Sequence, residues 1–245
     1  MTQLCRNSVL SLLNSFPVNA HAGLLLTKGL TSEPEGKQKQ EHIEKIARLN
    51  ASDIYLEAFN RWKAATINFA HTEKTLAGRL YIGVTRDNAL ETGVTVSHTY
   101  GMPIIPGSAV KGLCRSCASD WLENEEASAY LFGNEPEETD EAKIEMGGLI
   151  FHDAWWVPEA GNKPFVQEVV TVHHQEYYGS EGKQEATDFD SPVPAPQIAV
   201  QGSFYFVIEG DSAWTKLAIR LLEKGLEQRG VGAKRSSGYG YFSEN

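Results

Sequence analysis

Cysteines and long apolar runs are scarce in this sequence. Only three of its 245 residues are cysteine, and no apolar run approaches the length of a membrane span. The first residues do not form a charged segment followed by an apolar one, as a secretion signal does. We therefore expect a reduced, cytoplasmic protein. Hydrophobic residues make up 41% of the chain, which is typical of a globular, soluble domain with a substantial core.

Positive charge is also in short supply. The chain has 22 Lys and Arg against 32 Asp and Glu, a net charge of −10, which argues against a freely acting nucleic-acid binder. The charge is uneven, because residues 123–145 hold nine carboxylates and one lysine, whereas residues 216–235 hold six cations and two carboxylates. A local basic surface on an acidic body is typical of a protein that meets a polyanion at one defined place. We expect the acidic segment to be a solvated loop or a docking surface for a basic neighbour.

Apolar spacing and turn residues predict the order of the elements. Helices are predicted over 38–63, from Ser108 onward and over 212–228, and strands over 65–70, 75–84, 148–157, 165–172, 199–209 and 239–242. Ser108 follows Pro106-Gly107 and is the expected N-cap of its helix. Residues 173–197 show no periodicity, and the prolines of 192–196 exclude a central strand. This order fits one α+β domain of ferredoxin-like type.

The C-terminal stretch 229–242 is the clearest candidate site. Four glycines bracket two cations and two serines, in the set Gly230, Gly232, Lys234, Arg235, Ser236, Ser237, Gly238 and Gly240. Glycine permits positive φ, and successive N–H groups in such turns form a concave anion site that cations strengthen. The loop follows a predicted helix, the reverse of a nucleotide-binding loop, so an RNA backbone fits better than a nucleotide. The alternative is that Gly230 ends the helix and the other glycines only shape a turn.

A second feature lies on the helix that begins at Ser108. Lys111 and Arg115 are four residues apart and therefore lie side by side, away from the apolar stripe. Two like charges at this spacing repel, and cations near a helix N-terminus oppose its dipole. An anion bound at the helix start would reverse both penalties. The alternative is that both side chains simply extend into water.

Together these two motifs resemble the RAMP superfamily, the RNA-binding proteins of CRISPR effector complexes. The segment Pro-Ile-Ile-Pro-Gly-Ser-Ala-Val-Lys-Gly at 103–112 looks like the family's IPGSSLKG segment, with Ala109 in place of the commoner second serine. Residues 230–240 look like its C-terminal glycine-rich loop. The runs Leu90–Gly93 and Val170–Tyr178 and the Gly-Val-Gly-Ala-Lys at 230–234 are further similar to the sixth-subunit family of type III-B (Cmr) complexes.

The resemblance implies a single ferredoxin-like, RRM-like (RAMP) domain over 61–245, with an N-terminal helical extension over 1–60 and a thumb-like insertion at about 157–201. It implies a non-catalytic backbone or capping subunit that binds guide (CRISPR) RNA away from its tag end. Its partners would be guide and target RNA and the other Cmr backbone and small subunits, with no membrane, cofactor or metal. The family's target-cutting aspartate lies in a different backbone subunit, so no catalytic residue is carried over.

On this resemblance and the residue chemistry, the expected RNA-binding residues are Ser108, Lys111, Arg115, Gly230, Gly232, Lys234, Arg235, Ser236, Ser237, Gly238 and Tyr239, with His98, His174 and Tyr178 as weaker candidates. The aromatic pairs Trp155-Trp156 and Tyr177-Tyr178 can stack on bases. Because side chains alternate along a strand, we expect one member of each pair to point inward.

Two further sets of residues suggest other chemistry. Cys114 and Cys117 form a CxxC, but both fall on the apolar helix face, so we expect them to pack in the core. The set His98, His152, Asp153, His173 and His174 could in principle form a metal or general acid–base site, although its members fall on separate predicted elements. The alternative function is therefore a histidine-dependent RAMP-type endoribonuclease that processes CRISPR RNA.

Overall fold

The computed structural model describes residues 6–31, 36–84, 90–134, 146–159, 161–172 and 193–244, with four single residues between 180 and 187. Its helices are α1 Asn7–Asn14, α2 Ala22–Lys28, α3 Gly36–Ala47, α4 Asp53–Ala65, α5 Gly107–Trp121, α6 Glu125–Phe132 and α8 Ser212–Gln228. Its strands are β1 Ala70–Thr75, β2 Ile104–Ile105, β3 Ile150–Phe151, β4 Ala154–Trp156, β5 Phe165–Val172, β6 Val193–Val200 and β7 Ser203–Glu209. None of these helices is both long and apolar enough to span a bilayer.

The main sheet is antiparallel, and its strand order is β1-β7-β4-β2, with β3 also paired to β7. Phe242 forms a single bridge with Leu76, just past the C-terminal end of β1. The order Phe242, β1, β7, β4 therefore places the fourth, first, third and second strands of a βαββαβ unit side by side, with α5 and α8 as its two helices. The prediction of an α+β, ferredoxin-like domain is confirmed.

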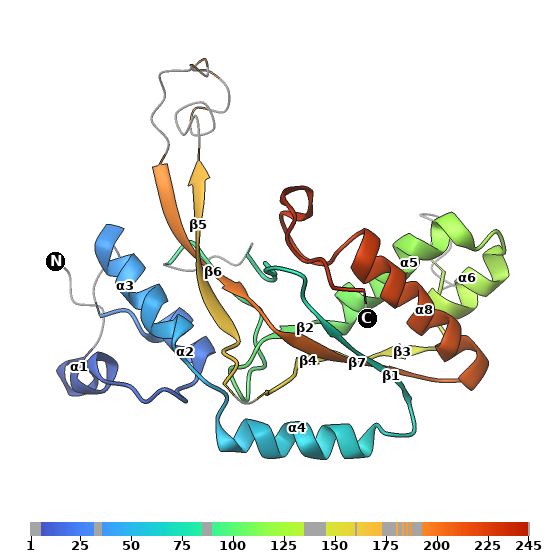
Figure 1. Cartoon of the computed structure of the whole chain (residues 1–245), viewed down its shortest axis with the longest axis horizontal. Coiled ribbons are helices and arrows are strands. Elements are labelled where there is room, and N and C mark those ends of the chain that lie inside the picture. The colour runs from blue at the N-terminus through green and yellow to red at the C-terminus, as the bar shows by residue number, and fades with distance from the viewer. Residues whose placement is uncertain are drawn as a thin grey trace.

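Helices cover both faces of this sheet (Figure 1). Phe204, Phe206 and Ile208 of β7 are buried in the core that includes α5 and α8. The alternate residues of β7, Tyr205 and Val207, are buried against Phe59 of α4. An RRM sheet binds RNA through aromatic side chains on an open face, and here α4 covers that face.

The strands β5 and β6 form a separate two-stranded hairpin that projects from the main sheet (Figure 1). Its register runs from Phe165 opposite Val200 to Val172 opposite Val193. Arg79 holds the base of the hairpin, because its Nε donates to Glu168 Oε1 at 3.2 Å and its Nη1 to Gln201 Oε1 at 2.6 Å. The hairpin falls within the insertion predicted at about 157–201; its thumb-like role stays a prediction. The division at residue 60 also stays a prediction, and that residue lies inside α4.

Several predicted boundaries are wrong, for local reasons. The helix predicted over 38–63 is two helices, because Ser52 Oγ accepts from the Tyr55 N–H and starts α4 anew. The strand predicted over 65–70 is absent from the described chain, because α4 continues to Ala65. In place of the two strands predicted over 65–70 and 75–84, the described chain has one strand, β1 at 70–75. The acidic segment predicted as a loop contains α6 at 125–132; residues 135–145 lie outside the described residues.

Three strand predictions also changed in extent. The strand predicted over 148–157 is divided into β3 and β4 by His152 and Asp153. The last strand, predicted over 239–242, is reduced to the bridge at Phe242. β6 begins at Val193 rather than 199, and its prolines are tolerated because this strand has only one paired neighbour over most of its length.

Candidate nucleic-acid interface

The glycines of the C-terminal loop allow it to close tightly. Gly232 has a φ of +87°, and a Cβ there would lie 2.2 Å from the Tyr81 carbonyl oxygen. A Cβ on Gly240, with a φ of +79°, would lie 1.9 Å from the Val231 carbonyl oxygen. These two glycines are therefore required by the fold of the loop itself, whether or not they also contact RNA.

Most N–H groups of the loop are used within the protein. The N–H of Val231 donates to the Gly240 carbonyl at 2.9 Å, and the N–H of Gly240 donates to the Arg79 carbonyl at 2.8 Å. Residues 235–237 form a short 3-10 helix, in which the Ser237 N–H donates to the Lys234 carbonyl at 3.0 Å. Within the described chain, the N–H groups of residues 234–236 make no backbone hydrogen bond. The same holds for the Gly232 N–H, and the anion cradle stays a prediction.

Cations of the loop line an open groove of about 590 Å³. Its lining consists of Ser116, Arg229, Gly232, Lys234, Arg235, Ser236 and Tyr241. The side chains at 234–236 are exposed, and Lys234 has a φ of +57°, a left-handed conformation that few residues other than glycine adopt. The groove lies at the junction of the loop with α5, because Arg229 donates to the Ser116 hydroxyl and to the Asp120 carboxylate of that helix.

Sequence reasoning missed three residues of this groove, Ser116, Arg229 and Tyr241. Arg229 directly precedes the glycine loop, so its position in the sequence was a usable signal. Ser116 follows Arg115, but only the packing of α5 on α8 brings it to the loop. That packing is close, since a Cβ on Gly225 of α8 would lie 2.8 Å from Leu113 Cγ.

The start of α5 differs from the prediction. The N-cap is Pro106, not Ser108, and it provides no side-chain hydrogen bond. Instead, the Gly107 N–H donates to Asp153 Oδ1 at 2.7 Å. A carboxylate acceptor is stronger than a hydroxyl, so Asp153 stabilises the positive end of the helix. The Asp153 carboxylate therefore supplies an anion at this helix start from within the protein.

The two predicted cations of α5 lie close to the groove in sequence but not in its lining. Lys111 and Arg115 are half-buried beside the exposed Ser108. Ser116 is the residue of α5 that lines the groove. The structure therefore brings α5 and the C-terminal loop together, through the contact of Ser116 with Arg229. RNA contact by Lys111 and Arg115 stays a prediction.

Cys114 and Cys117 are buried free thiols, as predicted. Burial raises the pKa of both thiols, so they are unreactive core residues rather than ligands or nucleophiles. Among the described residues, no three His, Cys, Asp or Glu side chains converge as a metal site would require.

The histidine set does not converge where it is described. His98 is exposed in a turn, His152 Nε2 lies 3.1 Å from Glu209 Oε2, and Asp153 caps α5. His173, His174, Tyr177 and Tyr178 lie outside the described residues.

The described aromatic candidates are packed against other rings. Trp156 is 1% exposed and Trp155 stacks on Tyr55, so the inward orientation predicted for one tryptophan of this pair is confirmed. The ring of Tyr239 packs on Tyr81, with centroids 4.7 Å apart, and it is half-buried. One face of Tyr239 is therefore already used within the protein.

Comparison with known proteins gives consistent matches. The sequence profile of the RAMP superfamily matches residues 74–243. The chain is 24% identical to the CRISPR system Cmr subunit Cmr6 of Pyrococcus furiosus, over 89% of this chain and 78% of that protein. It is 29% identical to the Cmr6 subunit of Saccharolobus solfataricus, over 78% of this chain and 62% of that protein. Its fold is similar to a chain in the cryo-EM structure of Type III-B Cmr-beta bound to cognate target RNA, with a TM-score of 0.66, 24% identity and coverage of 97% and 85%.

Proposed function

This chain belongs to the RAMP superfamily, and we propose that it is a non-catalytic, RNA-binding backbone or capping subunit of a type III-B CRISPR effector complex. It would bind guide RNA away from its tag end, and base pairing rather than protein contact would read the target RNA. Its protein partners would be the other Cmr backbone and small subunits, in the cytoplasm. The similarity to two subunits named Cmr6 supports this assignment.

The groove at the C-terminal loop is the observation that carries the RNA-binding part. Lys234 and Arg235 are exposed side by side, and neither forms an ion pair with a described carboxylate. Arg229 also lines this groove, where its guanidinium is paired with the Asp120 carboxylate. An open, polar groove with several cations suits an extended phosphate backbone better than a small ligand, which prefers an enclosed apolar pocket.

A salt titration of RNA binding tests this proposal. We expect single-stranded RNA of mixed sequence to bind with an affinity that falls as salt rises, and the double variant Lys234→Ala/Arg235→Ala to bind more weakly. Because each phosphate contact contributes roughly 0.7 to the log–log slope on single strands, the variant slope should flatten by roughly 1.4. Fluorescence anisotropy at several salt concentrations measures both quantities.

The matched control removes two exposed cations elsewhere, as Lys37→Ala/Arg61→Ala on α3 and α4. This control should leave the slope close to that of the native chain. An unchanged slope and affinity in the loop variant would remove the loop from the RNA interface.

The rival function is a histidine-dependent endoribonuclease of the same superfamily. Within the described residues the His98 ring makes no hydrogen bond or ion pair, so nothing there activates it as a base. Incubation of the chain with labelled repeat RNA separates the two functions. If the chain cleaves this RNA specifically and His98→Ala or His174→Ala abolishes the cleavage, the chain is an endoribonuclease and the proposed non-catalytic role is wrong.

A further inference from the structure

The outer edge of β1 is paired with described residues at one end only. The Ala77 N–H donates to the Tyr241 carbonyl and the Ser243 N–H to the Thr75 carbonyl, each at 2.9 Å. These two bonds flank the bridge between Leu76 and Phe242. The described C-terminal residues therefore cover only the last part of the outer edge of β1.

The rest of that edge presents unpaired backbone groups. The Leu76 N–H donates to the Gly202 carbonyl at 3.0 Å on the β7 side, and in an antiparallel pair the bonding direction alternates along the strand. His71 and Glu73 therefore direct their N–H and C=O groups away from β7. Within the described chain no other segment pairs with them. An open edge of this kind is a template for an added strand.

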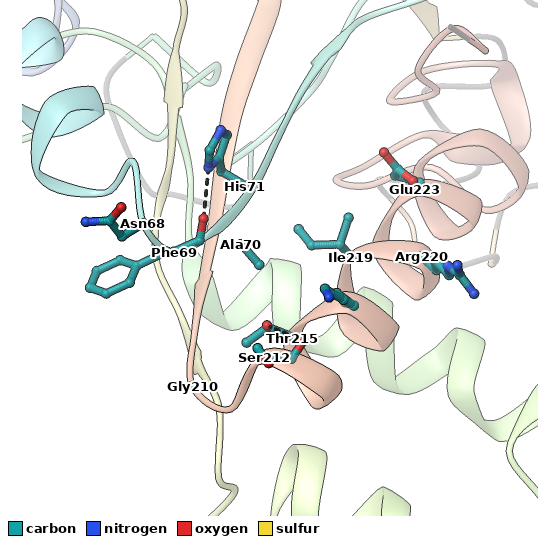
Figure 2. Close-up of a pocket in the computed structure, with 11 residues that line it drawn as sticks. Asn68, Phe69, Ala70, His71, Gly210, Ser212, Thr215, Ile219, Arg220 and Glu223 are labelled. Atoms are coloured by element: carbon teal, nitrogen blue, oxygen red, sulfur yellow. Dashed lines mark hydrogen bonds between the residues drawn. The ribbon is translucent and has the colours of Figure 1, made fainter.

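A groove of about 550 Å³ lies beside the start of this edge. Figure 2 shows Phe69, Ala70 and His71 on one side of it and Thr215, Ile219 and Arg220 of α8 on the other. A sheet edge beside a helix, with a partly apolar groove between them, is a geometry that accepts an extended peptide as an additional strand.

Two exposed cations lie at the rim of this groove. Lys216 and Arg220 are exposed, lie one helical turn apart, and form no ion pair within the described residues. The nearby carboxylate of Glu223 is already engaged, by the Thr72 hydroxyl at 3.0 Å and by Lys74 Nζ at 3.6 Å. Because two neighbouring cations repel, carboxylates on an incoming strand would relieve an existing penalty.

RNA matches these features less well than a peptide does. Phosphates can neutralise Lys216 and Arg220, but a nucleotide chain has no N–H and C=O groups at the spacing of a β-strand to pair with His71 and Glu73. The open edge and the cationic rim together therefore favour a polypeptide.

We propose that an acidic, extended segment of another protein chain adds to the outer edge of β1 as a strand, in the β1–α8 groove. Its backbone pairs with His71 and Glu73, and its carboxylates contact Lys216 and Arg220. This surface is separate from the groove at the C-terminal loop.

The test uses the full chain and two fluorescein-labelled decapeptides, one alternating valine with glutamate and one alternating valine with lysine. We expect the glutamate peptide to bind about tenfold more tightly or better, because the lysine peptide brings like charges together. Lys216→Glu/Arg220→Glu should weaken binding of the glutamate peptide by about tenfold or more. Glu73→Pro should do the same, because it removes an outward N–H that β7 does not use.

The matched control is Lys224→Glu, one turn further along α8 and outside the groove, where the ammonium lies 4.0 Å from the Trp121 ring centre. It should leave peptide affinity unchanged. If Glu73→Pro fails to fold by circular dichroism, the charge reversal on α8 still decides the outcome.

Several results would overturn the proposal. The proposal is wrong if neither peptide binds. It is also wrong if the glutamate peptide binds equally well to the native chain, to Lys216→Glu/Arg220→Glu and to Glu73→Pro. RNA affinity that falls in Lys216→Glu/Arg220→Glu, with no peptide binding, would assign the cations to RNA. Self-association that disappears in Glu73→Pro, with no peptide binding, would assign the edge to a second copy of this chain.

Discussion

Two glycines of the C-terminal loop share a positive φ but have different structural surroundings. At Gly240 a Cβ would lie 1.9 Å from the Val231 carbonyl oxygen, whereas at Gly238 nothing lies within 4 Å of the added carbon. Gly240 is therefore needed both for its backbone conformation and for the close approach of two backbone segments. Gly238 is needed for its backbone conformation alone, and it leaves the exposed side of the loop open.

The substitution Gly240→Ala should accordingly be much more destabilising than Gly238→Ala. We expect a loss of about 3 kcal/mol in the free energy of unfolding at Gly240, from strain and displacement of Val231 together. At Gly238 we expect about 1 kcal/mol, the cost of a left-handed conformation for alanine. Urea unfolding of both variants measures the difference. Equal losses would contradict the distinction drawn from the geometry.

At the scale of elements, a side-chain cluster around Arg79 joins the base of the β5–β6 hairpin to the rest of the domain, beside the Leu80–Val200 bridge and the packing of α3 on the hairpin. Arg79 donates to Glu168 of β5 and to Gln201 just after β6, and its backbone carbonyl accepts from Gly240. One residue thus contacts the hairpin and the glycine loop. Arg79 is therefore one of the contacts that fix the base of the hairpin relative to the glycine loop.

Removing this cluster should loosen the hairpin. We expect Arg79→Ala to lower the free energy of unfolding by about 1 kcal/mol, the value of a partly exposed, charge-assisted hydrogen-bond pair. The control Arg61→Ala breaks an exposed pair with Glu57, at 3.8 Å within one helix, and should cost less than about 0.5 kcal/mol. A double-mutant cycle with Glu168→Gln isolates the pair. An additive cycle would show that the contact does not stabilise the hairpin.

At the scale of the whole molecule, the surfaces available to partners are edges and loops. Both faces of the main sheet are covered by helices, and the chain carries a net charge of −10. The electric field of a negatively charged protein repels RNA at long range. The cations at 229–235 therefore have to attract RNA against the repulsion from the rest of the protein.

We therefore expect the isolated chain to bind guide RNA weakly and the assembled complex to bind it much more tightly. The difference in dissociation constant should be on the order of 100-fold at the same salt, because neighbouring subunits add contacts to the same strand. Anisotropy with one RNA, measured for the chain alone and for a reconstituted complex, gives both constants. Equal affinities would contradict the assignment of this chain as one part of a composite RNA surface.

The sequence by itself determined those features that depend on neighbouring residues. The apolar spacing of 212–228 predicted α8 with the bounds it has, and the same spacing on α5 predicted that Cys114 and Cys117 are buried. The glycine loop and the segment at 103–112 indicated the family, because their residue types and local order carry its motifs. Local backbone preference and side-chain periodicity are properties of a short segment, so they can be seen without the fold.

Only the tertiary structure decided how distant segments complete these features. Asp153 rather than Ser108 caps α5, α4 covers the sheet face, and the carbonyl of Tyr81 explains Gly232. Tertiary structure also forms the groove at Arg229 and Ser116. It likewise leaves the edge of β1 open at His71 and Glu73. Each of these joins residues far apart in the chain, and no local pattern specifies which distant backbone or carboxylate a segment will meet. Those contacts are fixed by the packing of the whole core, which places each segment against its neighbours.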